Sequence, residues 1–252
     1  MIPVFGMLRK LFLFFLIFLN LHIYLANTSL KPSSPKASFL NNGKYVLGAA
    51  GLSALAIGKR IYDGPEFLDA VDLTGKTIVI TGANTGLGKE ASIKIASLGK
   101  PELFLLCRDM KKAKIAMDEI VAKSGNTKIR LIECDLSDLK SISRAAAELK
   151  KSVAKIDVLQ LNSGVMAIPT REVTKDGFEK HMGVNHLGHF KLAQEVFPLL
   201  KNTKDARVVT VSSSAHLLGK IDRSNLQLDR EDSYGPWLAY GNSKLANILF
   251  TR

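Results

Sequence analysis

The chain has 252 residues, of which 46% are hydrophobic and 23% charged, a balance that fits one large globular domain and excludes a disordered chain or a repeat array. Its net charge is +12, but residues 1–62 carry seven basic residues and no acid, so the remainder carries only +5 and gives little reason to expect nucleic-acid binding. Two cysteines, Cys107 and Cys134, exclude a disulfide scaffold and a four-cysteine zinc module.

The N-terminal segment has the pattern of a leader. Residues 9–26 begin with two basic residues and continue as an apolar run with two polar interruptions, which predicts a signal peptide or a short signal anchor. Residues 27–44 form a polar linker without acids, which also suits a bipartite plastid leader. The apolar stretch 45–57 is flanked by basic residues and favours membrane association, with a packed helix as the alternative. We therefore expect a membrane-associated protein of the endoplasmic reticulum and secretory route, with the plastid as the alternative.

The expected catalytic domain, residues 73–252, opens on a strand and a glycine-rich turn. Thr77–Thr81 is a short β-branched run, glycines follow at 82, 86 and 88, and residues 89–98 have helical spacing. This arrangement suits a dinucleotide phosphate, because glycine lets the backbone approach it and the N–H groups of the helix start attract an anion.

Beyond the turn, predicted strands and helices alternate. Strands are expected at 103–107, 129–134, 158–162 and 208–212, and helices at 110–123, 138–152 and 183–200. This alternation predicts an α/β fold with a doubly wound parallel sheet of Rossmann type.

A hydride-transfer chemistry is indicated near the end of the chain. Tyr240 and Lys244 stand four residues apart, on one face of a helix. Hydride transfer at a carbinol or carbonyl carbon needs a proton to move at the oxygen, and a nearby ammonium favours the ionised form of a phenol. We expect Tyr240 to be the general acid and base, with Lys244 tuning it and holding the nicotinamide ribose. A serine would hydrogen-bond the reacting oxygen, and Ser212, Ser213 and Ser214 leave its register open.

Three stretches carry a family resemblance. Residues 81–88, TGANTGLG, resemble the fingerprint of the short-chain dehydrogenase/reductase family, and residues 183–190 and 243–250 resemble its retinol dehydrogenase branch. The resemblance covers about residues 73–252 and implies a lipophilic alcohol, aldehyde or ketone as substrate, such as a retinoid. It also implies that Asn185 supports a proton path through water, and that Ser213, which matches the second serine of the family's SSxxG-like motif, is the serine that hydrogen-bonds the reacting oxygen. The cofactor-binding residues that it implies are Gly82, Asn84, Thr85, Gly86, Leu87, Gly88, Lys89, Arg108, Asp135, Leu136, Asn162, Gly164, Tyr240 and Lys244.

Charge at the end of the second strand predicts NADP(H). An NAD site places an acid there for the ribose 2′-hydroxyl, whereas a 2′-phosphate needs a cation. Cys107 stands where the family's acid would be, Arg108 follows, and Lys89 adds a second cation beside the glycine turn. Asp109 is expected to cap the following helix.

Some features keep alternatives open. The family's Asn-Asn-Ala-Gly is here Leu161–Gly164, so only Asn162 and Gly164 match, and a plastid pigment reductase of the protochlorophyllide type is the alternative function. The sequence ends eight residues after Lys244, where the family's fold continues. We therefore expect a C-terminally incomplete chain with the strand 208–211 at an uncovered sheet edge, and a truncated, non-catalytic nucleotide-binding protein as the alternative of another class.

The expected partners follow from the same reading. His181, His186 and His189 lack accompanying acids or cysteines at ligand spacing, so no metal site is expected. We expect a lipophilic small molecule and a membrane as partners and no nucleic acid, and association into a homodimer stays open. Pro236 and Trp237 are expected either beside the substrate or in packing.

Overall fold

The computed structural model describes residues 71–251, so the leader predictions lie outside the described residues. Five parallel strands form one sheet in the order β3-β2-β1-β4-β5. The strands are β1 (Thr77–Thr81), β2 (Glu102–Cys107), β3 (Ile129–Glu133), β4 (Val158–Leu161) and β5 (Arg207–Thr210). The predicted doubly wound parallel sheet is confirmed.

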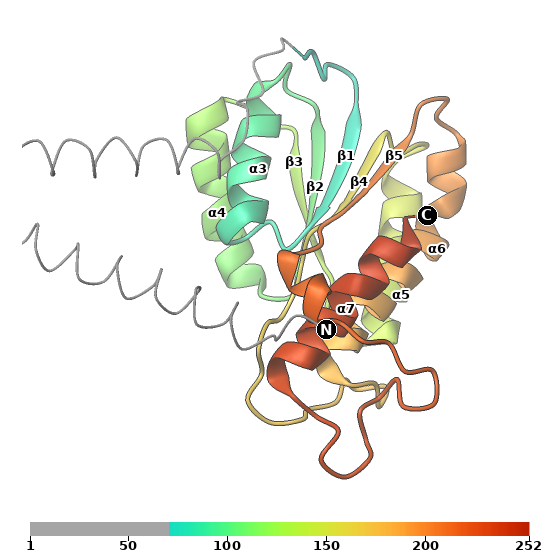
Figure 1. The fold of residues 1–252 in the computed structure, drawn as a ribbon. Coiled ribbons are helices and arrows are strands. Elements are labelled where there is room, and N and C mark those ends of the chain that lie inside the picture. Colours follow the sequence, from blue (N-terminus) through green and yellow to red (C-terminus); the bar gives the residue numbers. More distant parts are fainter. Residues whose placement is uncertain (1–70, 252) are drawn as a thin grey trace, which may run out of the picture. The chain divides into compact units, whose positions relative to one another are not determined.

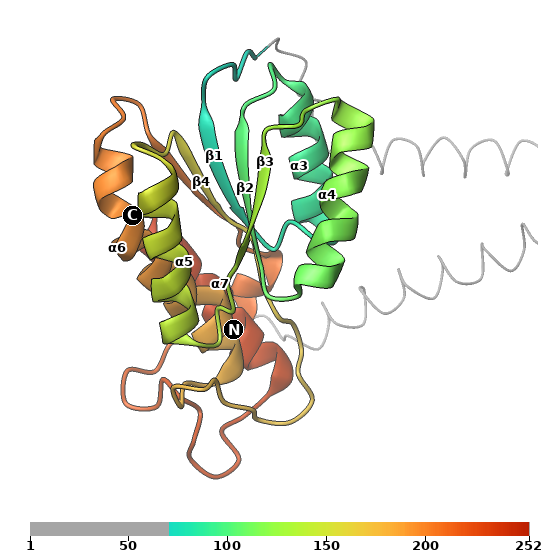
Figure 2. The ribbon, with the colours of Figure 1, turned by 180° about the vertical axis from the view of Figure 1, so that it is seen from behind.

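Helices cover both faces of the sheet (Figures 1 and 2). α3 (Gly86–Ser97) and α4 (Met110–Ser124) lie on one face, and α5 (Leu139–Ser152) and α6 (Gly188–Lys201) lie on the other. Successive side chains of a strand point to opposite faces. Ile78 and Ile80 accordingly belong to the core beneath α3 and α4, and Val79 belongs to the core beneath α5 and α6.

The predicted helix 183–200 differs from the observed one at its start. It begins as a π turn, η1 (Met182–Leu187), in which Gly188 N–H bonds to Gly183 O, and continues as α6. A Cβ at Gly188 would lie 2.6 Å from the Leu136 carbonyl oxygen, so the turn approaches a neighbouring backbone closely. Apolar periodicity does not register one widened turn, and π turns are frequent at functional sites. The predicted helix 89–98 also begins earlier, at Gly86 inside the glycine turn.

The remaining elements lie beyond the carboxyl ends of the strands. α7 (Pro236–Phe250) packs on the short 3₁₀ helix η2 (Ser214–Leu218) at that end of the molecule (Figure 1). β1 and β4 are neighbours whose following connections lead to opposite halves of the sheet, and such a switch point opens a crevice for ligands.

Among the described residues β5 borders the sheet, and its Val208 and Val209 side chains are about two-fifths exposed. Within residues 71–251, no helix combines the length and apolar character that crossing a bilayer requires.

Candidate functional site

A cavity of about 620 Å³ opens at the carboxyl ends of the strands, at the switch point. Most predicted site residues line it: Gly82, Asn84, Thr85, Leu87, Arg108, Asp135, Leu136, Asn162, Gly164, Ser213, Tyr240 and Lys244. Gly86, Gly88, Lys89 and Asn185 are not part of its lining. The sheet therefore brings together residues that lie up to 162 positions apart in the sequence.

The glycine turn forms an open cradle at the start of α3. Gly86 has a φ of +53°, a region that glycine adopts without strain, and a Cβ there would meet nothing within 4 Å. A Cβ at Gly88 would instead lie 2.5 Å from the side-chain nitrogen of Asn162 and against the Gly82 carbonyl. The turn is thus closely packed at Gly88 and open at Gly86, beside the N–H groups at the start of α3. This geometry fits a dinucleotide phosphate.

The cations at this edge are not quite those that the sequence predicted. Arg108 lines the cavity, but Lys89 points to α4, where its ammonium bonds to Glu119 Oε2 at 2.8 Å. A cation that was not predicted, Lys112, lines the cavity in the first turn of α4. The expected helix cap is confirmed, since the Asp109 carboxylate accepts from Lys112 N at 3.0 Å. Lys112 stands four residues after Arg108 in a predicted helix, which is the signal that would have found it.

Two thiols form part of the cavity wall. Cys107 and Cys134 are both free and buried. Burial raises the pKa of Cys107 to about 11 and that of Cys134 to about 12. Neither thiol is therefore ionised at neutral pH, and neither replaces the acid of an NAD site.

Helix α7 presents Tyr240 and Lys244 to the cavity. The Lys244 ammonium donates to the Val211 carbonyl at 3.1 Å and lies 5.7 Å from the centre of the Tyr240 ring. Burial lowers the pKa of Lys244, because the charged form loses water. The pair predicted from its four-residue spacing is thus in place.

Asn185 is held next to this pair by the π turn. Its side-chain oxygen accepts from Val165 N at 2.8 Å, and its nitrogen donates to Val165 O and to Ser243 Oγ, both at 2.9 Å. A Cβ at Gly164 would lie 3.2 Å from the Asn185 side-chain oxygen and 3.5 Å from the Lys244 ammonium. The Asn185 amide and the Lys244 ammonium therefore both lie next to Gly164, which belongs to the cavity lining, while Asn185 itself does not.

The serine register can be argued from hydrogen bonds. Ser212 Oγ donates to the Lys244 carbonyl at 2.8 Å, so its proton is already used in a hydrogen bond to the backbone. Ser213 Oγ accepts from Ala215 N at 3.2 Å, which leaves its proton available to an oxygen in the cavity. Ser214 is exposed and is not part of the cavity lining. These bonds favour Ser213 as the donor to substrate.

His181 and His186 form hydrogen bonds with different partners. The buried Glu179 carboxylate accepts from His181 Nδ1 at 2.8 Å and from Met182 N at 2.7 Å, and the His181 ring meets the Tyr240 ring edge-on at 6.2 Å. Burial opposes ionisation of Glu179, but these hydrogen bonds prevail and lower its pKa. His186 bonds to Asn247 at 3.2 Å. No group of three or more His, Cys, Asp or Glu suited to a metal occurs within residues 71–251.

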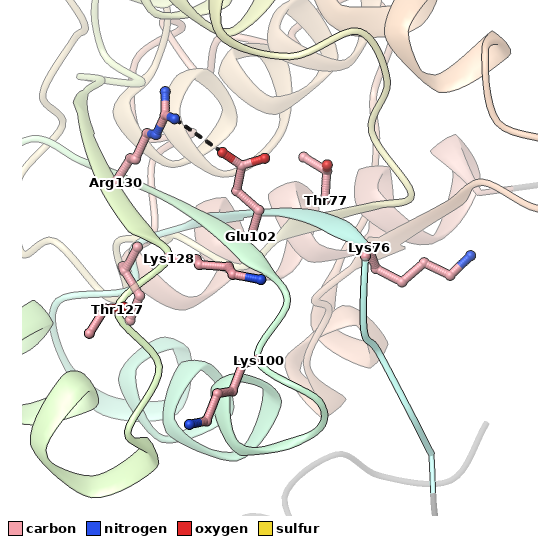
Figure 3. Close-up of a pocket in the computed structure, with 9 residues that line it drawn as sticks. Lys76, Thr77, Lys100, Glu102, Thr127, Lys128 and Arg130 are labelled. Carbon is pink, nitrogen blue, oxygen red and sulfur yellow. Dashed lines mark ion pairs between the residues drawn. The ribbon is translucent and has the colours of Figure 1, made fainter.

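A second cavity, of about 490 Å³, lies at the opposite, amino-terminal edge of the sheet (Figure 3). Its charged lining consists of Lys76, Lys100, Glu102, Lys128 and Arg130. Arg130 pairs with Glu102 at 3.4 Å, and the Lys76 side chain extends away from Lys100 and Lys128. These cations do not converge on one point, and the cavity contains none of the predicted site residues. The cavity at the carboxyl edge is therefore the candidate site.

Comparison with known proteins agrees with this geometry. The family model for short chain dehydrogenases matches residues 76–225. Human retinol dehydrogenase 12 is 46% identical over 194 residues, covering 77% of this chain and 60% of its own length. Human retinol dehydrogenase 13 is 40% identical over 213 residues, covering 83% of this chain and 63% of its own. The chain thus spans about 60% of the length of these curated relatives.

Solved structures share the fold. An uncharacterized protein from Mycobacterium paratuberculosis is 40% identical and superposes with a TM-score of 0.62, covering 73% of this chain and 62% of its own. The sequence and the arrangement of elements therefore point to the same family.

Proposed function

Because this chain belongs to the short-chain dehydrogenase family, we propose that it is an oxidoreductase that moves a hydride between NADP(H) and a hydrophobic alcohol, aldehyde or ketone. The observation that carries the proposal is the convergence of Tyr240, Lys244 and Ser213 with the glycine turn on one cavity. Similarity to retinol dehydrogenases supports the choice of a lipophilic substrate. Neither the pigment reductase nor the non-catalytic alternative gains support from these relatives.

The chain's residues divide the task of holding the cofactor. The turn around Gly86 would receive the pyrophosphate at the start of α3. Arg108 and Lys112 would pair with the 2′-phosphate, and Asp135 lies on the wall of the same cavity. Bound in this way, the nicotinamide supplies the hydride for reduction or accepts it in oxidation.

The protein's own groups handle the proton. In reduction, the Tyr240 hydroxyl gives its proton to the substrate oxygen as the hydride reaches the carbon, and in oxidation it takes that proton back. Ser213 donates a hydrogen bond to the same oxygen and stabilises the charge that develops there. The Lys244 ammonium beside the Tyr240 ring would hold the nicotinamide ribose, and the Asn185 amide lies where it can support reprotonation.

We also propose that the protein works at a membrane, which suits a lipophilic substrate. The support is the apolar and basic pattern of residues 9–26 and 45–57. Extraction of cellular membranes with alkaline carbonate tests this: an integral protein stays in the pellet, and recovery in the first soluble fraction would contradict it.

Site variants test the chemistry. In the full-length protein, Tyr240→Phe should lower the rate of retinal reduction by about 10²–10⁴-fold while NADPH binding, followed by fluorescence, survives. Ser213→Ala should lower the rate by about 10²-fold, whereas the matched variant Ser212→Ala, which loses only a bond to the Lys244 carbonyl, should cost far less. Tyr240→Phe activity within a few-fold of wild type would refute the assignment.

A further inference from the structure

Thr81, at the end of β1, lies at the centre of a buried polar junction. Its hydroxyl oxygen accepts from Asn162 N at 2.9 Å and Ser163 N at 3.1 Å, and it lies 2.8 Å from His189 Nε2. Backbone N–H groups can only donate, so both lone pairs of the hydroxyl are used. The hydroxyl proton therefore goes to the nearer of two acceptors, His189 Nε2 at 2.8 Å, and not to the Gln160 carbonyl oxygen at 3.5 Å.

The other nitrogen of the His189 ring settles the tautomer. Nδ1 lies 2.9 Å from the Asn185 carbonyl oxygen, which can only accept, so Nδ1 carries the proton. Protonation of Nε2 as well would leave two donors facing each other at Thr81. His189 is completely buried, and burial lowers its pKa to about 4, with the nearby charges of Lys244 and His186 acting in the same direction.

The junction joins the two halves of the site. Thr81 directly precedes the glycine turn, Asn162 and Ser163 begin the cavity wall after β4, and Asn185 sits in the π turn. The Thr81–His189 bond spans 108 positions of sequence. The His189 ring thus connects the Thr81 hydroxyl to the Asn185 carbonyl. Loss of either hydrogen bond would let the glycine turn shift relative to the side chain of Asn185.

We propose that His189 is a positioning residue: neutral, with its proton on Nδ1, it fixes the catalytic π turn to the dinucleotide turn through Thr81. The kinetic part of this inference rests on the proposed hydride transfer, but the tautomer does not.

The first test uses the unaltered protein. Long-range ¹H–¹⁵N spectra of the labelled, intact chain should show His189 with Nδ1 protonated and Nε2 bare, unchanged between about pH 5.5 and 8. A His189 resonance that titrates near its ordinary pKa of about 6.5, or that shows the Nε2–H tautomer, would overturn the proposal even if the enzyme proved inactive.

The second test separates positioning from folding. Thr81→Ser keeps the hydroxyl and should leave kcat for aldehyde reduction within about threefold, whereas Thr81→Val and His189→Phe should each lower kcat about tenfold or more with little change in KM. The double variant Thr81→Val/His189→Phe should be no slower than the slower single variant, because the two residues act through one bond. Additive losses, or equal losses in Thr81→Ser and Thr81→Val, would refute the link. A fully active Tyr240→Phe variant would refute the proposed function, whereas the tautomer of His189 would still be tested by the spectra.

Discussion

Replacing Arg108 with alanine should change which nicotinamide cofactor the protein prefers. Arg108 lines the cavity at the end of β2, where Cys107 leaves no carboxylate to receive a ribose hydroxyl. A hydrogen bond between charged partners is worth about 1.5–3 kcal/mol, so the Kd for NADPH should rise roughly 10–150-fold. The Kd for NADH should change by less than about threefold, because NADH has no 2′-phosphate for the guanidinium to bind.

Lys112 should contribute less than Arg108. Its ammonium lies 3.8 Å from Asp109 Oδ2, which offsets part of its charge, and it is a point charge without the fork of a guanidinium. Lys112→Ala should therefore weaken NADPH binding about three- to tenfold. The matched control is Lys89→Ala, since this cation is paired with Glu119 and is absent from the cavity lining.

Fluorescence titration of both cofactors against the four proteins, at low and at high salt, provides the measurement. High salt should narrow the difference between NADPH and NADH in the wild type, because exposed charges are screened. Wild type that binds NADH as tightly as NADPH would refute the assignment of Arg108 to the 2′-phosphate. The same holds if Lys89→Ala weakens NADPH binding as much as Arg108→Ala does.

Glu179, the two buried cysteines and Gly164, an exposed residue of the cavity wall, each give a further prediction. Glu179→Gln should lower the free energy of unfolding by about 1.5–3 kcal/mol, seen as a lower Tm that exposed Glu172→Gln does not share. Because folding lowers the pKa of Glu179, the stability that its carboxylate contributes is present at neutral pH and is lost as pH falls below about 4.5. The Tm values of the wild type and of Glu179→Gln should therefore converge in acid. Cys107 and Cys134, with pKa values raised to about 11 and about 12, should resist a thiol reagent at pH 8 until the chain unfolds; rapid labelling of the native protein would contradict this. Gly164→Ala should lower kcat about tenfold with little loss of Tm, because its Cβ would press on the Asn185 amide oxygen at 3.2 Å and lie 3.5 Å from the Lys244 ammonium. An unchanged kcat would show that the two side chains move aside without cost to the reaction.

The sheet was predictable because its signals are local. Each strand is a short stretch rich in apolar residues, and each helix has apolar residues at helical spacing. With η1 and α6 counted as one helix, no observed bound therefore differs from the expected one by more than three residues. Part of the candidate site was predictable for a related reason. In parallel sheets the carboxyl ends share one edge, so Arg108 after β2 and Asn162 after β4 could be expected to lie at the same edge, whereas Tyr240 was expected from its spacing to Lys244 and from the family resemblance.

The buried junction was not predictable because its signals are not local. Thr81 fits a β-branched strand end, and His189 fits a helix face beside His186, so neither residue departs from its local pattern. Their pairing depends on how closely the π turn approaches β1, which no local pattern reports. The polar groups that a fold buries become recognisable only when every donor and acceptor is counted.

The contrast between Lys89 and Lys112 shows how position in the fold differs from position in the chain. Lys89 follows the glycine turn immediately, but it lies on the side of α3 that faces α4, and Glu119 on that helix attracts its ammonium. Lys112 comes 24 residues after Gly88, the last glycine of the turn, yet it stands in the first turn of the helix that leaves β2 at the cavity edge. The first turn after a parallel strand is held at the ligand-binding edge by the strand itself. Cations that read a phosphate in such a sheet are therefore best sought one helical turn past the strand end, and in this chain that position is occupied by Lys112.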